Sequence, residues 1–169
     1  MLDDALKTAR SQEEECRAYY GPVMSQSPAT VIYVASSCKK GGSDDARAGC
    51  GIYWGDKSKR NVGASVPGAQ SDARAALYAV VLALLNAPES RTLVITSGSQ
   101  YAIRSFCYWA AGNATRGWPC TNADIIRVGS ECLRARPAGV TFNWISREDG
   151  VKNTHFKAAR ALAKAAAAR

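Results

Sequence analysis

The feature that most constrains the fold is a change of apolar period along the chain, from strand-like runs to helical spacing. Residues 31–34 (VIYV) form a β-branched and aromatic run that suits a buried central strand. Residues 48–54 and 59–66 are predicted to be two further strands joined around a Gly-Asp turn. The next segment repeats apolar residues at i, i+3, i+4, i+7 and i+8, which indicates an amphipathic helix capped by Ser71 or Asp72. Consecutive strands followed by a helix predict an α/β domain.

The second half of the chain continues this alternation of strands and helices. A short buried strand is predicted over residues 93–96, and helices are predicted over 100–111 and 122–136. A fifth strand is expected over 140–146, followed by a terminal helix that Thr154 caps. This order predicts a five-stranded mixed sheet with helices on both faces, in which the second strand runs antiparallel to its neighbours.

Residues 1–29 are predicted to be a helical extension and a short linker, and residues 30–169 the main domain. Apolar residues near helical spacing precede an acidic run, and Gly21 and Pro22 end the extension. The extension is expected to dock on the main domain or on a partner, because amphipathic helices and exposed tyrosines commonly anchor interfaces. The candidate partner-binding residues are Leu2, Leu6, Tyr19 and Tyr20.

Composition narrows the partners and the compartment. Twenty-two Lys and Arg against 14 Asp and Glu give a net charge of +8, which favours nucleic acid first and acidic protein surfaces second. Six widely spaced cysteines without a CxxC pair favour reduced structural thiols over zinc or disulfides. No secretory signal is visible, and no apolar run reaches the roughly 20 residues of a membrane span. We expect an intracellular protein in a reducing compartment, with no membrane, small-molecule substrate or cofactor.

Four stretches share their residues with a known family. Residues 47–55 read RAGCGIYWG where the family pattern is RAGxGVYWG, and residues 61–63 read NVG. Residues 67–75 read PGAQSDARA against PGRQTNQRA, and residues 93–101 (LVITSGSQY) match LVLYTDSxF without a gap. At this spacing the chain resembles eukaryotic type 1 ribonuclease H over about residues 30–165. The resemblance implies the ribonuclease H fold and descent from a metal-dependent nuclease of RNA–DNA hybrids.

The chain departs from the family at its four metal-binding carboxylates. Two-metal hydrolysis needs clustered oxygen anions that hold divalent cations about 4 Å apart. Gly150 stands where the family has a mobile histidine, and the single histidine, His155, lies several positions further on. We therefore expect a pseudoenzyme rather than an enzyme, with no metal and no catalytic residue. The four degenerate positions are Ala35, Ala76, Gly98 and Arg160.

A relocated metal site is disfavoured, because the remaining acidic candidates lie on predicted turns or at a helix cap. A two-metal site requires ligands on rigid elements. Arg160 has two open interpretations: its guanidinium supplies positive charge at the old metal position, or it points to solvent. The acidic candidates are Asp44, Asp45, Asp72, Glu148 and Asp149.

The resemblance also implies nucleic-acid contacts, and the chain keeps only part of them. Two aromatic positions of the DNA channel remain, as do the hydroxyl and the amide of the phosphate pocket. The pocket arginine is lost at Ala69, and two RNA-reading amides are lost at Asp72 and Ala73, which weakens recognition of a hybrid. Basic residues still allow salt-sensitive contact with RNA. The candidate nucleic-acid-binding residues are Ser71, Tyr101, Trp109, Asn122, Arg160, Lys39 and Lys40.

Three functions remain open on the sequence. The first is a catalytically inactive scaffold module of a ribonucleoprotein complex, with other protein subunits as partners and RNA contact of low specificity. The second is a subunit that binds RNA or RNA–DNA hybrid without cleaving it. The third is a ribonuclease H with a relocated metal site. For the first function, removal of residues 1–22 is expected to abolish partner binding and to leave the domain folded.

Overall fold

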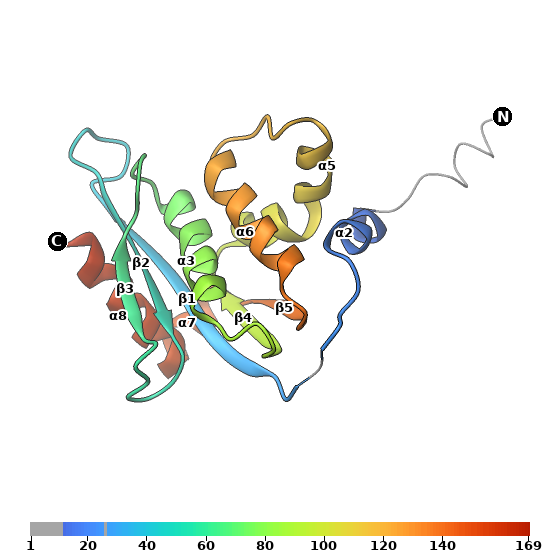
Figure 1. The fold of residues 1–169 in the computed structure, drawn as a ribbon. Coiled ribbons are helices and arrows are strands. Elements are labelled where there is room, and N and C mark those ends of the chain that lie inside the picture. Colours follow the sequence, from blue (N-terminus) through green and yellow to red (C-terminus); the bar gives the residue numbers. More distant parts are fainter. Residues whose placement is uncertain (1–11, 26) are drawn as a thin grey trace.

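The computed structural model describes residues 12–25 and 27–169, and Figure 1 shows a central sheet with helices on both faces. The strand order is β3-β2-β1-β4-β5. β2 runs antiparallel to β1 and β3, whereas β4 runs parallel to β1 and β5. The predicted five-stranded mixed sheet is confirmed. Its strands are β1 (Thr30–Lys39), β2 (Arg47–Tyr53), β3 (Val62–Ser65), β4 (Leu93–Ser97) and β5 (Val140–Trp144).

The helices form one layer on each side of this sheet. α8 packs on one face, against β1, β2 and β3, and α3 packs on the other face with α6 against it. A π-helical segment, η1, follows α4 directly and continues into α5. The helices are α2 (Gln12–Tyr20), α3 (Asp72–Asn86), α4 (Gln100–Arg104), η1 (Ser105–Trp109), α5 (Ala110–Thr115), α6 (Ala123–Ala135), α7 (Arg147–Lys152) and α8 (Thr154–Ala167).

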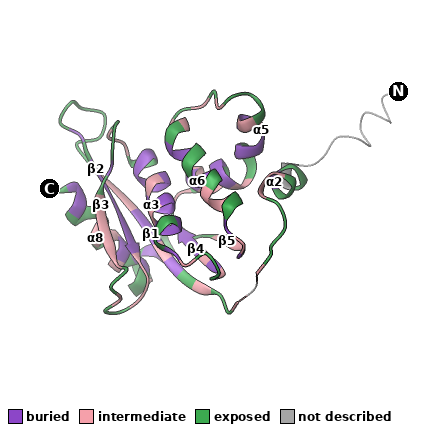
Figure 2. Cartoon of the chain, viewed as in Figure 1, coloured by how far each residue is buried: buried purple, intermediate pink, exposed green. Residues whose placement is uncertain are grey.

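The main core lies between the sheet and α3, where Figure 2 shows the buried residues concentrated. The helical spacing of apolar residues in α3 directs one face of the helix at the sheet. Leu77 and Val80 are fully buried there against Ile32 of β1, and Phe106 of η1 closes the core beside them. The burial of these side chains drives the sheet and α3 together.

α8 lies unusually close to the other face of the sheet. A β carbon at Gly51 or Gly63 would overlap backbone atoms of α8, so only glycine fits at these two positions. The facing residues of the helix, Ala159 and Ala163, are completely buried. This close packing fixes the position of α8 and of the side chains that it carries.

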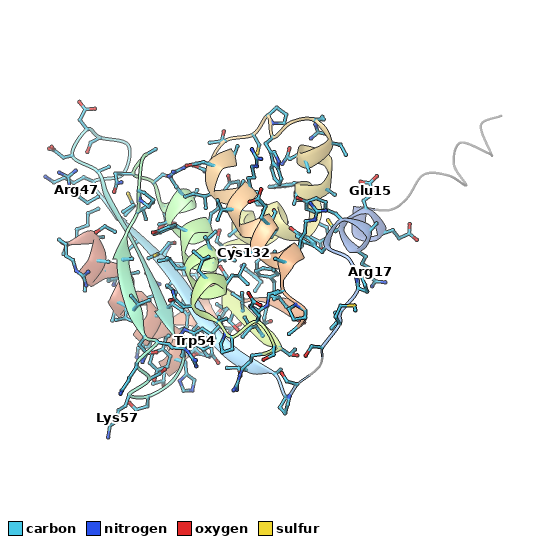
Figure 3. All side chains as sticks on the ribbon, viewed as in Figure 1. Glu15, Arg17, Arg47, Trp54, Lys57 and Cys132 are labelled. Atoms are coloured by element: carbon cyan, nitrogen blue, oxygen red, sulfur yellow. The ribbon has the colours of Figure 1, made fainter. Side chains whose placement is uncertain are left out.

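The β2–β3 turn makes β3 shorter than the predicted strand over residues 59–66. The side chain of Asn61 accepts a hydrogen bond from the Trp54 backbone N–H at 2.7 Å and donates to the Gly55 carbonyl at 2.7 Å. Lys57 adopts a positive φ of 56° within the turn. Trp54 and Lys57 lie at this end of the sheet in Figure 3. The turn holds residues 59–61 out of the ladder.

The region after β5 also differs from the prediction, because a short helix, α7, begins directly after the strand. Ser146 caps α7 by accepting a hydrogen bond from the Asp149 backbone N–H at 3.1 Å. The cap of α8 is Asn153 rather than Thr154. Its side-chain oxygen accepts from the Phe156 backbone N–H at 2.9 Å.

Candidate nucleic-acid interface

A pocket of about 320 Å³ opens where β4 ends beside the middle of β1. The two strands are parallel, with Val34 level with Ser97, so Ala35 and Gly98 follow on at the same edge of the sheet. α3 and α8 bound the pocket from opposite faces of the sheet. The structure therefore brings together all four positions at which the resemblance places carboxylates. These positions are Ala35, Ala76, Gly98 and Arg160.

The ring of Phe156 forms an apolar side of this pocket. Phe156 is only 7% exposed and packs in one cluster with Ala35. A β carbon built at Gly98 would lie 3.2 Å from the Phe156 Cζ atom, and one at Gly150 would lie 3.0 Å from two other ring atoms. The ring occupies space that a side chain at either glycine would need. Phe156 of the terminal helix thus crowds position 150, where the family has a histidine.

The charged side chains of the pocket are mainly basic. Arg160 of α8 is half-buried, and among the described residues it has no hydrogen-bond or ion-pair partner. Arg147 also lines the pocket and is exposed, as is the acidic residue Asp72. Two guanidinium groups therefore stand against one carboxylate. The pocket favours an anion over a cation.

The residues of the pocket do not fit a divalent metal ion. Magnesium requires several oxygen ligands, with carboxylates prominent among them. Asp72 is the acidic residue that lines the pocket, and Arg160 would repel a cation beside it. Across residues 12–25 and 27–169, no group of three or more His, Cys, Asp or Glu side chains is placed to hold a metal.

A polar cluster beside the pocket joins α3 to α6. Ser71 caps α3 by accepting a hydrogen bond from the Arg74 backbone N–H at 3.1 Å. The buried Arg74 guanidinium donates to both carboxylate oxygens of Asp124, at 2.9 and 2.6 Å, and to the Asn122 side-chain oxygen at 3.3 Å. Its hydrogen bonds lower the pKa of Asp124 to about 2. This arrangement holds Ser71 and Asn122, both predicted phosphate-pocket residues, in one rigid cluster.

The two predicted channel aromatics lie next to this cluster. Asn122 donates to the Tyr101 hydroxyl oxygen at 3.2 Å. The ring centroids of Tyr101 and Trp109 are 6.3 Å apart, and Trp109 is 40% exposed. Both residues line a groove of about 420 Å³. An exposed indole next to a half-buried phenol provides a surface on which a base or a sugar can stack.

The predicted basic residues Lys39 and Lys40 lie at the far end of β1. Both are exposed, and Lys40 has a long ion pair of 3.9 Å with Asp45. They follow the pocket residue Ser36 by three and four positions, on the same strand and its turn. They extend the positive charge away from the pocket along one direction of the sheet. Their contact with nucleic acid stays a prediction.

The structure places the predicted partner-binding tyrosines against their own domain. α2 packs on η1, α5 and α6. The Tyr20 hydroxyl donates to the Phe106 carbonyl at 2.6 Å, and the Arg134 guanidinium lies 4.6 Å from the centroid of the Tyr19 ring. Burial raises the pKa of the Tyr20 hydroxyl. Leu2 and Leu6 lie outside the described residues, and binding of a partner by these four residues stays a prediction.

Sequence reasoning missed three features of the site. Arg147 directly follows the strand predicted over residues 140–146, so its place at the sheet edge was readable from the sequence. Phe156 is one apolar residue of the predicted terminal helix, and its packing against Gly98 and Gly150 has no local signal in the sequence. The Arg74–Asp124 pair joins residues 50 positions apart, and no local sequence signal identifies such a pair.

Comparison with known proteins decides the family. A sequence model of the RNase H family matches residues 27–168, which is most of the chain. The chain belongs to the RNase H family. This membership confirms the resemblance to ribonuclease H1 and, with the sheet, the predicted fold.

Curated relatives of the RNase H family match parts of the domain. Ribonuclease H1 of Mus musculus is 33% identical over 99 residues, which cover 57% of this chain and 35% of that protein. Ribonuclease H of Schizosaccharomyces pombe is 31% identical over 119 residues, 66% of this chain and 44% of that protein. Ribonuclease H1 of Homo sapiens is 33% identical over 90 residues, which cover 52% of this chain and 32% of that protein. The chain thus spans less than half of the length of these relatives.

A solved RNase H structure resembles the fold. The crystal structure of LC9-RNase H1, described as a type 1 RNase H with the type 2 active-site motif, superposes with a TM-score of 0.62. The match covers 85% of this chain and 75% of that chain at 21% identity, a level that supports the fold alone. Within the described residues, no helix has the length and apolarity needed to cross a membrane.

The relatives contradict the prediction that the chain is not an enzyme. At 31–34% identity they are named as ribonucleases. The prediction rested on four side chains of a single pocket, whereas the family match extends over nearly the whole domain. Membership in a ribonuclease family replaces the earlier assignment.

Proposed function

We propose that this RNase H domain binds the backbone of a duplex that contains an RNA strand, with RNA–DNA hybrid as the first ligand. The observation that supports this most strongly is a continuous path of contacts along one side of the molecule. Asn122 donates to the Tyr101 hydroxyl and accepts from Arg74. Arg74 donates its backbone N–H to Ser71, whose neighbour Asp72 lines the basic pocket. Stacking surface and anion-binding pocket thus belong to one rigid unit.

The proposed binding is directed at the backbone more than at the identity of the strands. At the start of α3, Ala69, Asp72 and Ala73 are exposed and offer no amide or guanidinium to a strand. Contacts with phosphates then dominate, and such binding typically has a Kd of about 10⁻⁴ to 10⁻⁶ M at physiological salt. We propose a hybrid affinity in this range.

Fluorescence anisotropy with labelled hybrid, duplex RNA and duplex DNA at about 0.15 M salt tests the proposal. Trp109→Ala is expected to weaken hybrid binding about ten-fold, because one stacking contact is lost. Trp144→Ala is the matched control, since Trp144 is 48% exposed but does not line the groove of Trp109. Failure of the wild-type protein to bind hybrid, or equal binding by both variants, would contradict the proposal.

Hydrolysis of the hybrid is followed in parallel samples that contain Mg²⁺ or Mn²⁺, because the relatives are named as ribonucleases. Cleavage and binding are separate readouts. Anisotropy is recorded at short times and in EDTA, so that cleavage of the label-bearing strand does not imitate weak binding.

Protein partnership, the first expectation from the sequence, is retained as a second candidate. Two apolar side chains that follow α2, Val23 and Met24, are 55% and 76% exposed. Their segment is held in place because the Met24 and Ser25 N–H groups both donate to the Pro137 carbonyl. A pull-down with ribonuclease treatment tests this candidate. Retention of a defined partner by the wild type and its loss in the Val23→Ser/Met24→Ser variant would support it.

A further inference from the structure

We infer that the pocket around Arg160 binds one backbone phosphate of the nucleic acid directly, by its guanidinium rather than through a metal ion. This inference rests on the proposed function and names the group that the pocket around Arg160 binds. The pocket lies at the edge of the sheet where β1, β4, α3 and α8 converge. It is hollow, positively charged and open to solvent along one side of the molecule.

Arg160 is available for an external ligand. Its guanidinium has no hydrogen-bond or ion-pair partner in the part of the chain that the structure describes. By contrast, Arg74 and Arg136, which are buried, both donate to partners within the protein. A half-buried guanidinium without a partner gains a charge-assisted hydrogen bond when an anion enters, and it has no internal bond to break first.

The backbone at Arg160 is fixed before a ligand arrives. Its neighbour Ala159 is completely buried, and so is Ala163 one turn later. Gly51 and Gly63 allow the α8 backbone to rest on the sheet. The helix therefore has no room to shift away from the pocket. Because the backbone is fixed, only the Arg160 side chain has to be ordered on binding, which limits the entropic cost of recognising one defined group.

The other polar groups of the pocket match a phosphate. Arg147 adds a second guanidinium, and the Ser36 hydroxyl has no partner among the described residues. A phosphate offers several acceptor oxygens and pairs well with a planar guanidinium. The side-chain oxygens of Ser99 and Ser146, in contrast, are already engaged as helix caps.

Asp72 selects a phosphate that is part of a larger ligand. Its carboxylate lines the same pocket and reduces the net charge to that of one guanidinium. A free phosphate dianion is therefore held weakly. A phosphodiester carries a single negative charge, and the contacts of its strand with Tyr101 and Trp109 supply further binding energy. The pocket thus favours a backbone phosphate over free inorganic phosphate.

Binding to hybrids in which a single phosphate has been made neutral tests the inference. Each phosphate of one strand in turn is replaced by a methylphosphonate, which keeps the shape and removes the charge. Wild type, Arg160→Gln and Arg91→Gln are compared by anisotropy. Arg91 is the matched control, because it is exposed at the opposite end of β1, where it donates to the Thr30 hydroxyl.

We expect wild type and Arg91→Gln to lose about ten-fold in affinity at one linkage, and Arg160→Gln to be insensitive at that same linkage. Arg160→Lys is expected to restore part of the sensitivity. Thermal melting of the variants verifies folding. Equal sensitivity of wild type and Arg160→Gln at every linkage would overturn the inference and leave the proposed function intact. Absence of hybrid binding by the wild type would overturn both.

Discussion

Phe156 packs its ring edge against the backbone of Gly98, so that a β carbon at position 98 would lie 3.2 Å from the Phe156 Cζ atom. Gly98 directly follows β4 and Phe156 lies in the first turn of α8, and both line the pocket of Arg160. A larger residue at position 98 requires the ring to shift by a few tenths of an ångström.

Gly98→Asp is therefore expected to destabilise the domain by about 1–3 kcal/mol, through crowding of the new side chain against the Phe156 ring. Gly41→Asp is the control, because a β carbon there meets only the Cys38 sulfur at an ordinary 3.7 Å. Urea unfolding of both variants measures the difference. Equal loss of stability in the two variants would show that the ring does not restrict position 98.

The Arg74–Asp124 pair predicts a pH-dependent contribution to stability. The pKa of Asp124 is lowered to about 2 in the folded protein, from an ordinary value of 3.8. The stabilisation is therefore complete above pH 3.8 and is lost as the pH falls toward 2. Asp124 is 66% exposed, and solvent screening limits the stabilisation to about 1 kcal/mol.

Unfolding of Asp124→Asn measured between pH 7 and pH 2 checks this prediction. The variant should be less stable than wild type at neutral pH and should converge with it at low pH. Glu131→Gln, which breaks the exposed pair with Arg127, is the control and should change little. A constant difference across the whole pH range would refute the assignment.

The Tyr20 hydroxyl is expected to hold α2 on the domain. Tyr20→Phe removes its 2.6 Å hydrogen bond to the Phe106 carbonyl and should destabilise the docked helix by about 1 kcal/mol. Hydrogen exchange of the α2 amides should then accelerate several-fold, while the exchange of β1 stays unchanged. Tyr108→Phe serves as the control, because Tyr108 is 45% exposed. Unchanged protection of α2 in Tyr20→Phe would show that apolar contacts alone anchor the helix.

Two of the six free cysteines are predicted to react slowly with alkylating agents. Burial raises the pKa of Cys50 and Cys107 to about 11, so almost no reactive thiolate is present at pH 8. Cys38 is partly exposed and should be alkylated first. Iodoacetamide labelling followed by peptide mass spectrometry measures the order. Labelling of Cys50 as fast as that of Cys38 would contradict the packing of α3 and α8 on β2.

The sequence predicted the sheet well because each strand carries its own local signal. The run over residues 31–34 and the strand-type pattern over 48–54 both became central strands. α7 was missed because its six residues, REDGVK, show no apolar period. The cap of α8 was shifted by one residue because Asn153 and Thr154 are both good capping residues, and local preference does not choose between them.

The pocket was predictable only in part. The resemblance aligned Ala35, Ala76, Gly98 and Arg160, and the fold gathers all four. The resemblance did not predict contacts between residues that are distant in the sequence. The packing of Phe156 against Gly98 and the pairing of Arg74 with Asp124 depend on how α8 and α6 cross the sheet and α3. Sequence periodicity does not encode these crossings.

The salt dependence of hybrid binding measures how many backbone phosphates the domain neutralises. If the domain holds the backbone through Arg160 and other basic side chains, log K plotted against log [NaCl] should fall with a slope of about −0.9 for each phosphate neutralised. We predict measurable binding at about 0.15 M salt and a slope for Arg160→Gln that is shallower by about 0.9. Arg91→Gln should keep the wild-type slope. Absence of hybrid binding, or a binding constant that does not change with salt, would contradict the account.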